Sequence, residues 1–160
     1  MADSTTDERA QALGEQLITA HDEFRGELAR LREQLDSFLA GGGSADTPAP
    51  PALDHQLRTN CLSFCEHLHG HHTAEDTRLF PYLEEHYPDL APAIARLRDE
   101  HGTVGRLLGD IRTLLEEAAQ HDPARVRDEF RRLSTELEEH LTYEEEQLVP
   151  TLNTFRGNPF

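Results

Sequence analysis

The 160-residue sequence contains no lysine and no tryptophan, and only two cysteines, one methionine and three valines. Two cysteines are too few for a scaffold stabilised by disulfides. The scarcity of valine and the lack of alternating β-branched runs argue against a β-sheet protein. No run of about 18 apolar residues is present, so we predict no membrane-spanning helix. A signal peptide has a basic segment followed by an apolar one, and the first residues, MADSTTDERA, have neither. We therefore predict a cytoplasmic protein.

Positive charge is scarce as well. Arginine supplies all 15 basic residues, against 31 aspartates and glutamates, and the formal net charge is −16. A protein that binds nucleic acid needs a basic surface to neutralise phosphates, so we expect no nucleic-acid partner. The length fits a single domain, which we predict over residues 1–160 with the bundle itself at about 6–152.

Apolar residues recur every three or four positions, which is the spacing of amphipathic helices. Glycines, prolines and capping residues divide this pattern into four long helices. They are predicted to run from Thr6 to Ala40, from Ala52 to the turn His86–Asp89, from Leu90 to Gln120 and from Pro123 to Leu152.

The connections between these helices differ in length. Gly41–Pro51 is rich in glycine and proline and predicts a flexible linker after the first helix, and a short polar tail, 153–160, follows the last. Pro81 and Pro150 are expected to bend the second and the fourth helix. Because the second and third connections are short, we predict an all-α fold, an up-down-up-down antiparallel four-helix bundle.

Histidine is abundant, with ten residues, and several of them belong to an internal repeat. His71–Leu83 (HHTAEDTRLFPYL) matches His140–Leu152 (HLTYEEEQLVPTL), and both follow the pattern H-x-x-x-E-[DE]-x-x-L-x-P-x-L. More weakly, the segment that begins at His21 matches the segment that begins at His101. Each copy is therefore a helical hairpin that supplies one histidine from its first helix and an HxxxE pair from its second.

These repeated residues have the chemistry of metal ligands. A histidine and a glutamate four positions apart lie on one face of a helix, one turn from each other. An antiparallel bundle would bring four such faces together, because apolar residues flank each histidine; a solvated helix face is the alternative. Four imidazoles and two carboxylates are too many for one tetrahedral zinc ion and suit two metal ions. The predicted ligands are His21, His71, Glu75, His101, His140 and Glu144.

The order H, HxxxE, H, HxxxE, with LFP and LVP after the two glutamates, resembles the hemerythrin-like (HHE cation-binding) family over about residues 15–152. The resemblance implies a hemerythrin-like bundle that holds two non-haem iron ions, oxo- or hydroxo-bridged, with Glu75 and Glu144 as bridging carboxylates. Manganese or a mixed metal pair stays open, because these metals share the same ligands.

One position departs from the family pattern. Oxygen-carrying hemerythrins have a second histidine four residues after the histidine of the third helix, where this sequence has Gly105. We predict that His72, next to His71, replaces it at the second iron. An exposed or outer position of His72 is the alternative.

The resemblance implies a protein that reacts with a small oxidant: dioxygen, hydrogen peroxide or nitric oxide. A di-iron oxidoreductase similar to a catalase or peroxidase would do so. An oxygen carrier or store, or an iron- or oxygen-sensing module without turnover, is the alternative. A bundle that binds no metal and serves protein contact is a third possibility. The expected partner is a diatomic or peroxide ligand, and the sequence identifies no redox partner.

Neighbouring residues are predicted to have structural or solvated roles. Cys61 and Cys65 are expected to be small buried hydrophobes rather than a redox pair. His67 is expected to cap the end of the site, and Tyr143 is expected in packing or at the surface. A role beside the metals is the alternative for each. Three further histidines are expected at helix ends on the surface: His55, His86 and His121.

Charged residues near the predicted ligands are expected to face solvent. In the run Glu144–Glu146, only Glu144 is predicted to point inward by the helical period. Arg25 and Arg78 are expected to pair with carboxylates at the surface, where such pairs contribute little to stability.

Overall fold

The computed structural model describes residues 2–41, 55–116 and 123–154, and over these ranges it is helical with no strand. The elements are α1 (Ala2–Gly41), α2 (His55–Ala74), the π-turn η1 (Glu75–Leu79), α3 (Phe80–His86), the short 3₁₀ helix η2 (Pro88–Leu90), α4 (Ala91–Glu116) and α5 (Pro123–Leu152). The predicted all-α class is confirmed for this part of the chain. The predicted linker beyond Gly41, the end of the predicted third helix and most of the predicted tail lie outside the described residues.

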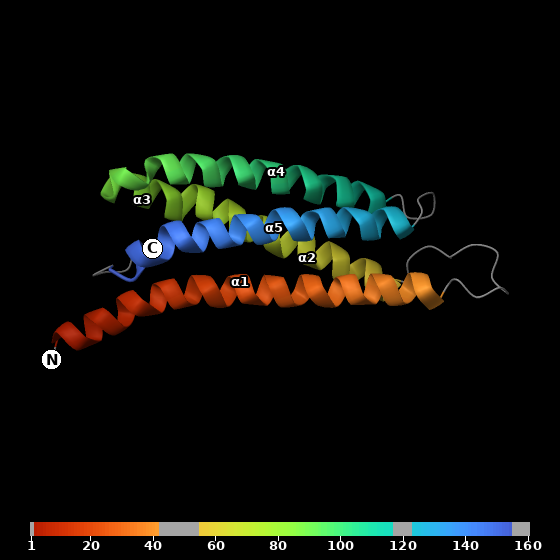
Figure 1. Cartoon of the computed structure of the whole chain (residues 1–160), viewed down its shortest axis with the longest axis horizontal. Helices are drawn as coiled ribbons and strands as arrows, with labels where there is room; N and C mark the ends of the chain where they lie inside the picture. The colour runs from red at the N-terminus through yellow and green to blue at the C-terminus, as the bar shows by residue number, and fades with distance from the viewer. Residues whose placement is uncertain (1, 42–54, 117–122, 155–160) are drawn as a thin grey trace.

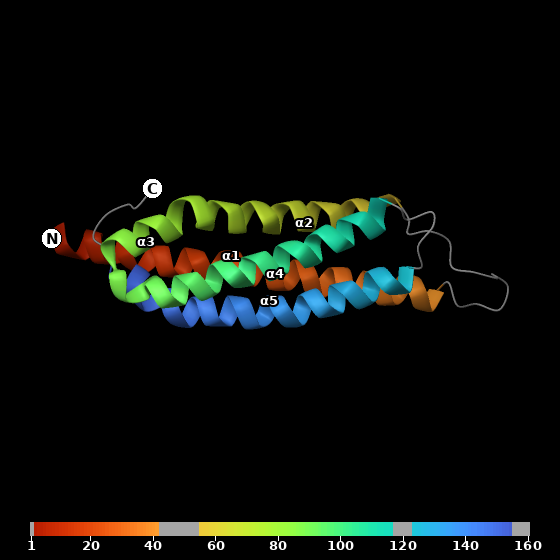
Figure 2. The same ribbon diagram turned by 90° about the horizontal axis from the view of Figure 1, so that it is seen from above.

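Four long helical segments lie side by side, because α2, η1 and α3 continue one another (Figures 1 and 2). In this bundle α1 packs against α5 and α2, and α4 packs against the same two partners. No helix among the described residues has the length and apolar character needed to cross a membrane.

The first helix is longer than predicted. It begins at Ala2 rather than Thr6, since the segment before Thr6 contains no glycine or proline that would stop a helix. It also includes Gly41, the first residue of the predicted linker. Glycine is common at the carboxyl end of helices, so the boundary falls inside the glycine run rather than before it.

The second helical segment contains a π-turn that the periodicity did not predict. Its closing hydrogen bond runs from the amide of Phe80 to the carbonyl of Glu75, five residues back. Pro81 follows in the first turn of α3, where a missing amide hydrogen is tolerated. The irregularity expected at Pro81 is thus a π-turn just before it, whereas α5 continues through Pro150 to Leu152.

Two apolar clusters form the core, one on each side of a polar layer. The larger cluster includes Phe24, Leu68, Val104 and Leu137. The smaller cluster contains Leu17, Leu79, Phe80, Leu83, Ile94, Leu97, Leu148 and Leu152. Along α1, α2 and α4 the predicted histidine ligands fall between the members of these two clusters.

Candidate metal centre

The polar layer consists of the seven residues predicted as ligands. Six of them are buried: His21, His72, Glu75, His101, His140 and Glu144. His71 is the exception, with 20% of its side chain exposed. Each helical segment of the bundle contributes at least one of them, so residues far apart in the sequence meet at one level of the bundle.

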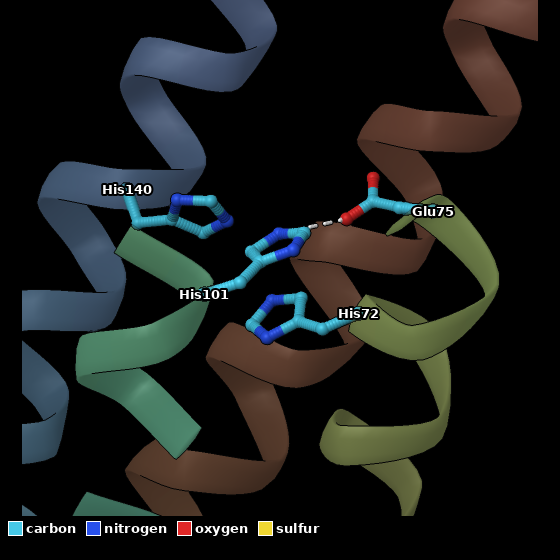
Figure 3. Close-up of side chains that lie close together, drawn as sticks. All are labelled: His72, Glu75, His101 and His140. Atoms are coloured by element: carbon cyan, nitrogen blue, oxygen red, sulfur yellow. Dashed lines mark ion pairs between the residues drawn. The ribbon is translucent and has the colours of Figure 1, made fainter. Parts of the chain in front are cut away.

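These seven residues form two groups whose potential ligand atoms lie within 4.8 Å of one another. One group contains His72, Glu75, His101 and His140, and Figure 3 shows these side chains converging from different helices. The other group contains His21, His71, Glu75 and Glu144. Glu75 belongs to both groups, which therefore adjoin each other.

Both carboxylates contact imidazoles of the two groups. One oxygen of Glu75 lies 3.2 Å from Nε2 of His101, and the other lies 3.5 Å from Nε2 of His71. The Oε2 atom of Glu144 lies 3.2 Å from Nε2 of His140 and 3.8 Å from Nε2 of His21. Two carboxylates placed in this way can bridge two cations, one in each group.

The inner atoms of the cluster fit metal ions because they otherwise lack partners. The Nε2 atoms of the five histidines and all four oxygens of Glu75 and Glu144 are buried, and none makes a hydrogen bond within the described part of the chain. Leaving one such atom unsatisfied costs about 1–3 kcal/mol. Summed over all these atoms, the cost is comparable to the whole free energy of unfolding of a typical domain, about 5–15 kcal/mol. Cations that accept these lone pairs would remove that cost.

Three of the five imidazoles are oriented by an outer carboxylate. The Nδ1 atom of His21 lies 2.8 Å from Oε2 of Glu145, that of His101 lies 2.8 Å from Oδ1 of Asp76, and that of His140 lies 2.9 Å from Oε1 of Glu100. A carboxylate only accepts, so each Nδ1 carries the hydrogen and donates it. The lone pair of Nε2 is then directed into the cluster, as a metal ligand requires.

The prediction that Glu145 is a solvated residue is wrong. Only 22% of its side chain is exposed, and it accepts from His21. Arg25 lies 2.9 Å from the same carboxylate and also pairs with Glu138 and Asp22. Arg25 thus belongs to the support of the cluster, because it holds the carboxylate that orients His21. The helical period turns Glu145 away from the centre of the bundle, but this direction faces the neighbouring helix α1.

The pKa values of three imidazoles favour metal binding, whereas contacts with Glu144 and Glu100 raise the pKa of His140 despite its burial. Burial lowers the pKa of His71 to about 4, and it also lowers the pKa values of His72 and His101. These imidazoles are therefore neutral near pH 7, which is the form that binds metal ions.

The two carboxyl groups differ in the direction of their pKa shifts. Burial and the nearby Glu144 carboxylate raise the pKa of Glu75 well above its usual range. Burial alone would raise the pKa of Glu144 too, but its contacts with Glu75, His140 and His21 lower it. Of the two carboxyl groups, Glu75 is therefore the one that takes up a proton more readily when no cation is bound.

His72 lies inside the cluster rather than in the alternative exposed position. Its ring stacks on that of His101, with 4.0 Å between ring centroids and 15° between the planes. Its Nε2 is one of the unsatisfied inner atoms. His72 therefore supplies a fifth imidazole to the cluster, and its ligation of a metal stays a prediction.

The neighbouring residues mostly lie where packing predicts. Cys61 and Cys65 are buried free thiols, and burial raises the pKa of each to about 12. His67 is 59% exposed and faces Glu27 rather than the cluster. Tyr143 packs against the smaller apolar cluster, with the guanidinium of Arg96 3.8 Å from its ring centroid.

A pocket of about 330 Å³ opens beside the second group. It lies between α1, the segment formed by α2 and η1, and the end of α5, and His71 and Glu75 are among its lining residues. This opening accounts for the partial exposure of His71, and it gives a small molecule access to the cluster from one side.

Residues 13–152 match the family described as the hemerythrin HHE cation-binding domain. The match covers most of the chain and includes all seven residues of the cluster, so the chain belongs to this family and the predicted resemblance is confirmed. No curated protein and no solved structure shows significant similarity to the chain.

Proposed function

We propose that this protein is a non-haem di-iron protein that reacts with a small oxidant: dioxygen, hydrogen peroxide or nitric oxide. The observation that carries the proposal is the pair of ligand groups that share Glu75, in a chain that belongs to a cation-binding family. Mixed imidazole and carboxylate ligands with an open position are typical of non-haem iron sites.

The residues divide unequally between the two positions. His72, His101 and His140 would hold one iron ion, while His21 and His71 would hold the other. Glu75 and Glu144 would bridge them. The position with two imidazoles has fewer protein ligands, and it is also the one beside the pocket at His71. This asymmetry supports a single open coordination position on the pocket side.

The protein's own contribution is orientation and exclusion of water. When bound, an iron pair supplies two electrons together and a coordination position for a small oxidant. Glu145, Asp76 and Glu100 hold three imidazoles in one tautomer and one direction. The two apolar clusters close the site on both sides, so water reaches it mainly from the pocket.

Peroxide treatment of the iron-loaded protein tests this proposal. We expect a change in the optical spectrum and evolution of gas from excess hydrogen peroxide, with both reduced in His72→Gln because iron binding is weakened. His69→Gln is the matched control, since His69 is exposed on the same helix. A wild-type protein that holds iron but is inert to peroxide, dioxygen and nitric oxide would contradict the proposal.

Oxygen carriage is the second candidate, and the position of His72 favours it. With His72 in the cluster, five imidazoles surround the two positions despite Gly105. A stable oxygenated spectrum that reverts on degassing, without gas evolution from peroxide, would identify a carrier rather than an enzyme.

The proposal includes the up-down-up-down order of the four helical segments. In Figure 1 the start of α1 and the end of α5 lie at the same end of the bundle, which supports the up-down-up-down order. The cytoplasmic location and the lack of a nucleic-acid partner stay predictions.

A further inference from the structure

The pocket beside His71 is larger than a small oxidant requires. Its volume is about 330 Å³, whereas a water molecule occupies about 30 Å³ in the liquid, and dioxygen and hydrogen peroxide are of similar size. A volume near 300 Å³ is at the lower end of pockets that bind organic ligands. Most of the wall is apolar, with four leucines: Leu13, Leu17, Leu79 and Leu152. Such a wall binds hydrocarbon better than water.

The internal repeat shows which residues leave this space open. Counted from the matched histidines, Gln16 and Ala20 correspond to Arg96 and Glu100, and Ala74 corresponds to Tyr143. In the second hairpin, Arg96 donates to Glu100 at 3.0 Å and lies over the ring of Tyr143.

The matched histidines His71 and His140 differ in exposure, in line with the size of the side chains around them. The large side chains of the second hairpin leave His140 only 1% exposed, whereas His71 is 20% exposed. Small side chains at matched positions of the first hairpin therefore create an opening that the second hairpin fills.

A single cationic residue, Arg78, lines the pocket. It lies in the π-turn, three residues after Glu75, and its side chain is exposed. No hydrogen bond or ion pair joins it to another described residue, although acidic residues outnumber basic ones two to one in the chain. The matched residue in the second hairpin is the neutral Gln147. A guanidinium with no partner among the described residues, placed at an apolar pocket, is suited to a carboxylate, which it binds through two parallel hydrogen bonds.

We propose that this pocket binds a small organic carboxylate with an apolar body. The carboxylate pairs with Arg78, and the body lies against Leu13, Leu17 and Leu152, so that the ligand ends beside His71. The inference deepens the proposed function, on which it rests for the role of the ligand next to the metals. Binding itself depends on the pocket alone.

Equilibrium dialysis of radiolabelled hexanoate against the purified protein tests the proposal, with the metal content of the same sample measured. We expect a dissociation constant of about millimolar for a ligand of this size. Arg78→Gln should weaken binding about fivefold or more through loss of the charged pair. Ala74→Tyr, which copies Tyr143, should abolish it by filling the pocket. Arg106→Gln, at an exposed arginine on α4, is the control that should leave binding unchanged.

The outcomes separate this inference from the proposed function. Hexanoate binding that both Arg78→Gln and Ala74→Tyr leave unchanged would overturn the inference, as would equal binding of the neutral hexanol. Loss of binding in both variants supports it, whatever the metal content. Protein that binds hexanoate but holds no metal would overturn the proposed function and leave the pocket assignment standing.

Discussion

Among single residues, the five clustered histidines fall into two classes. His21, His101 and His140 each donate from Nδ1 to a carboxylate on another helix or on the adjoining π-turn. His71 and His72 have no such carboxylate partner within the described part of the chain. Three imidazoles are therefore fixed before any metal arrives, and the two adjacent ones on α2 are held by packing against neighbouring rings.

Glu145→Gln tests the importance of this orientation. The amide can still accept a hydrogen bond but lacks the charge that raises the basicity of His21. We expect the affinity for the metal in the second group to fall about 10- to 100-fold, measured by competition with a chelator. Glu146→Gln is the control, because Glu146 is the exposed neighbour in the same acidic run. Equal affinities in the two variants would show that Glu145 does not act through His21.

We predict that the raised pKa values of Cys61 and Cys65 make the fold less stable at alkaline pH. Burial raises their folded-state pKa from 9.0 to about 12. Below pH 9 the thiols are protonated in both states, so their contribution is constant. Between pH 9 and 12 only the unfolded chain loses these protons, so the free energy of unfolding falls by up to about 1.4 kcal/mol per pH unit for each thiol.

Chemical denaturation across this pH range measures the effect. The double variant Cys61→Ala, Cys65→Ala should show a flatter profile above pH 9. If its pH dependence matched that of the wild type, the thiols would not be responsible.

The inner ligands could be predicted from the sequence, but the outer carboxylates could not. A histidine and glutamate repeated with one spacing on two helices is a rare pattern, so the repeat identified the inner residues. Glu145 resembled a solvated residue, because the orienting contact crosses to another helix. The repeat did contain a signal, since Asp76 and Glu145 occupy matched positions and both accept from a histidine on another helix.

Among the elements, the π-turn at Glu75–Leu79 distinguishes the second helical segment from the fourth. Both contain the same proline, Pro81 or Pro150, six residues after the glutamate, yet only the first has a π-turn. The proline therefore does not predict the π-turn by itself. π-Turns occur often at functional sites, and this one begins at the glutamate shared by both ligand groups.

Deletion of Thr77 tests the role of the π-turn. One residue fewer would let the segment close as a regular α-helix and keep both flanking apolar faces in register. We therefore expect a folded, cooperatively melting protein with weakened metal binding, because Glu75 would be rotated. Deletion of Thr135 from the regular helix α5 is the control. It turns the following residues by about 100° and should prevent stable folding.

Circular dichroism with thermal melting, followed by metal analysis, separates the two deletions. If neither deletion variant folded, the bundle would not tolerate removal of the extra residue in the π-turn. Wild-type metal affinity after deletion of Thr77 would show that the turn does not position Glu75.

In the whole molecule, the polar layer crosses the bundle between two apolar clusters. The ligands come from all four long helical segments, so a metal pair would connect these segments at one level of the bundle. The bundle could be predicted from apolar periodicity. The pocket could not, because it depends on small residues such as Ala20 and Ala74, whose significance appears only when the two hairpins are compared in space.

Removal of the metals should therefore lower the melting temperature. Ligand present at 100 times its dissociation constant stabilises a fold by about 2.7 kcal/mol. For a chain of this size, 1 kcal/mol corresponds to about 2–4 °C, so we expect a decrease of roughly 5–10 °C in the metal-free protein. Differential scanning calorimetry before and after chelation, and after metal is restored, measures it. An unchanged melting temperature would contradict a structural role for the cluster.

The proposed function requires the seven clustered residues to hold two metal ions in one chain. Elemental analysis of protein expressed with added iron tests it most directly, with His101→Ala beside the wild type. We expect two iron ions per wild-type chain and loss of both in His101→Ala. A wild-type protein that binds one ion or none under these conditions would contradict it.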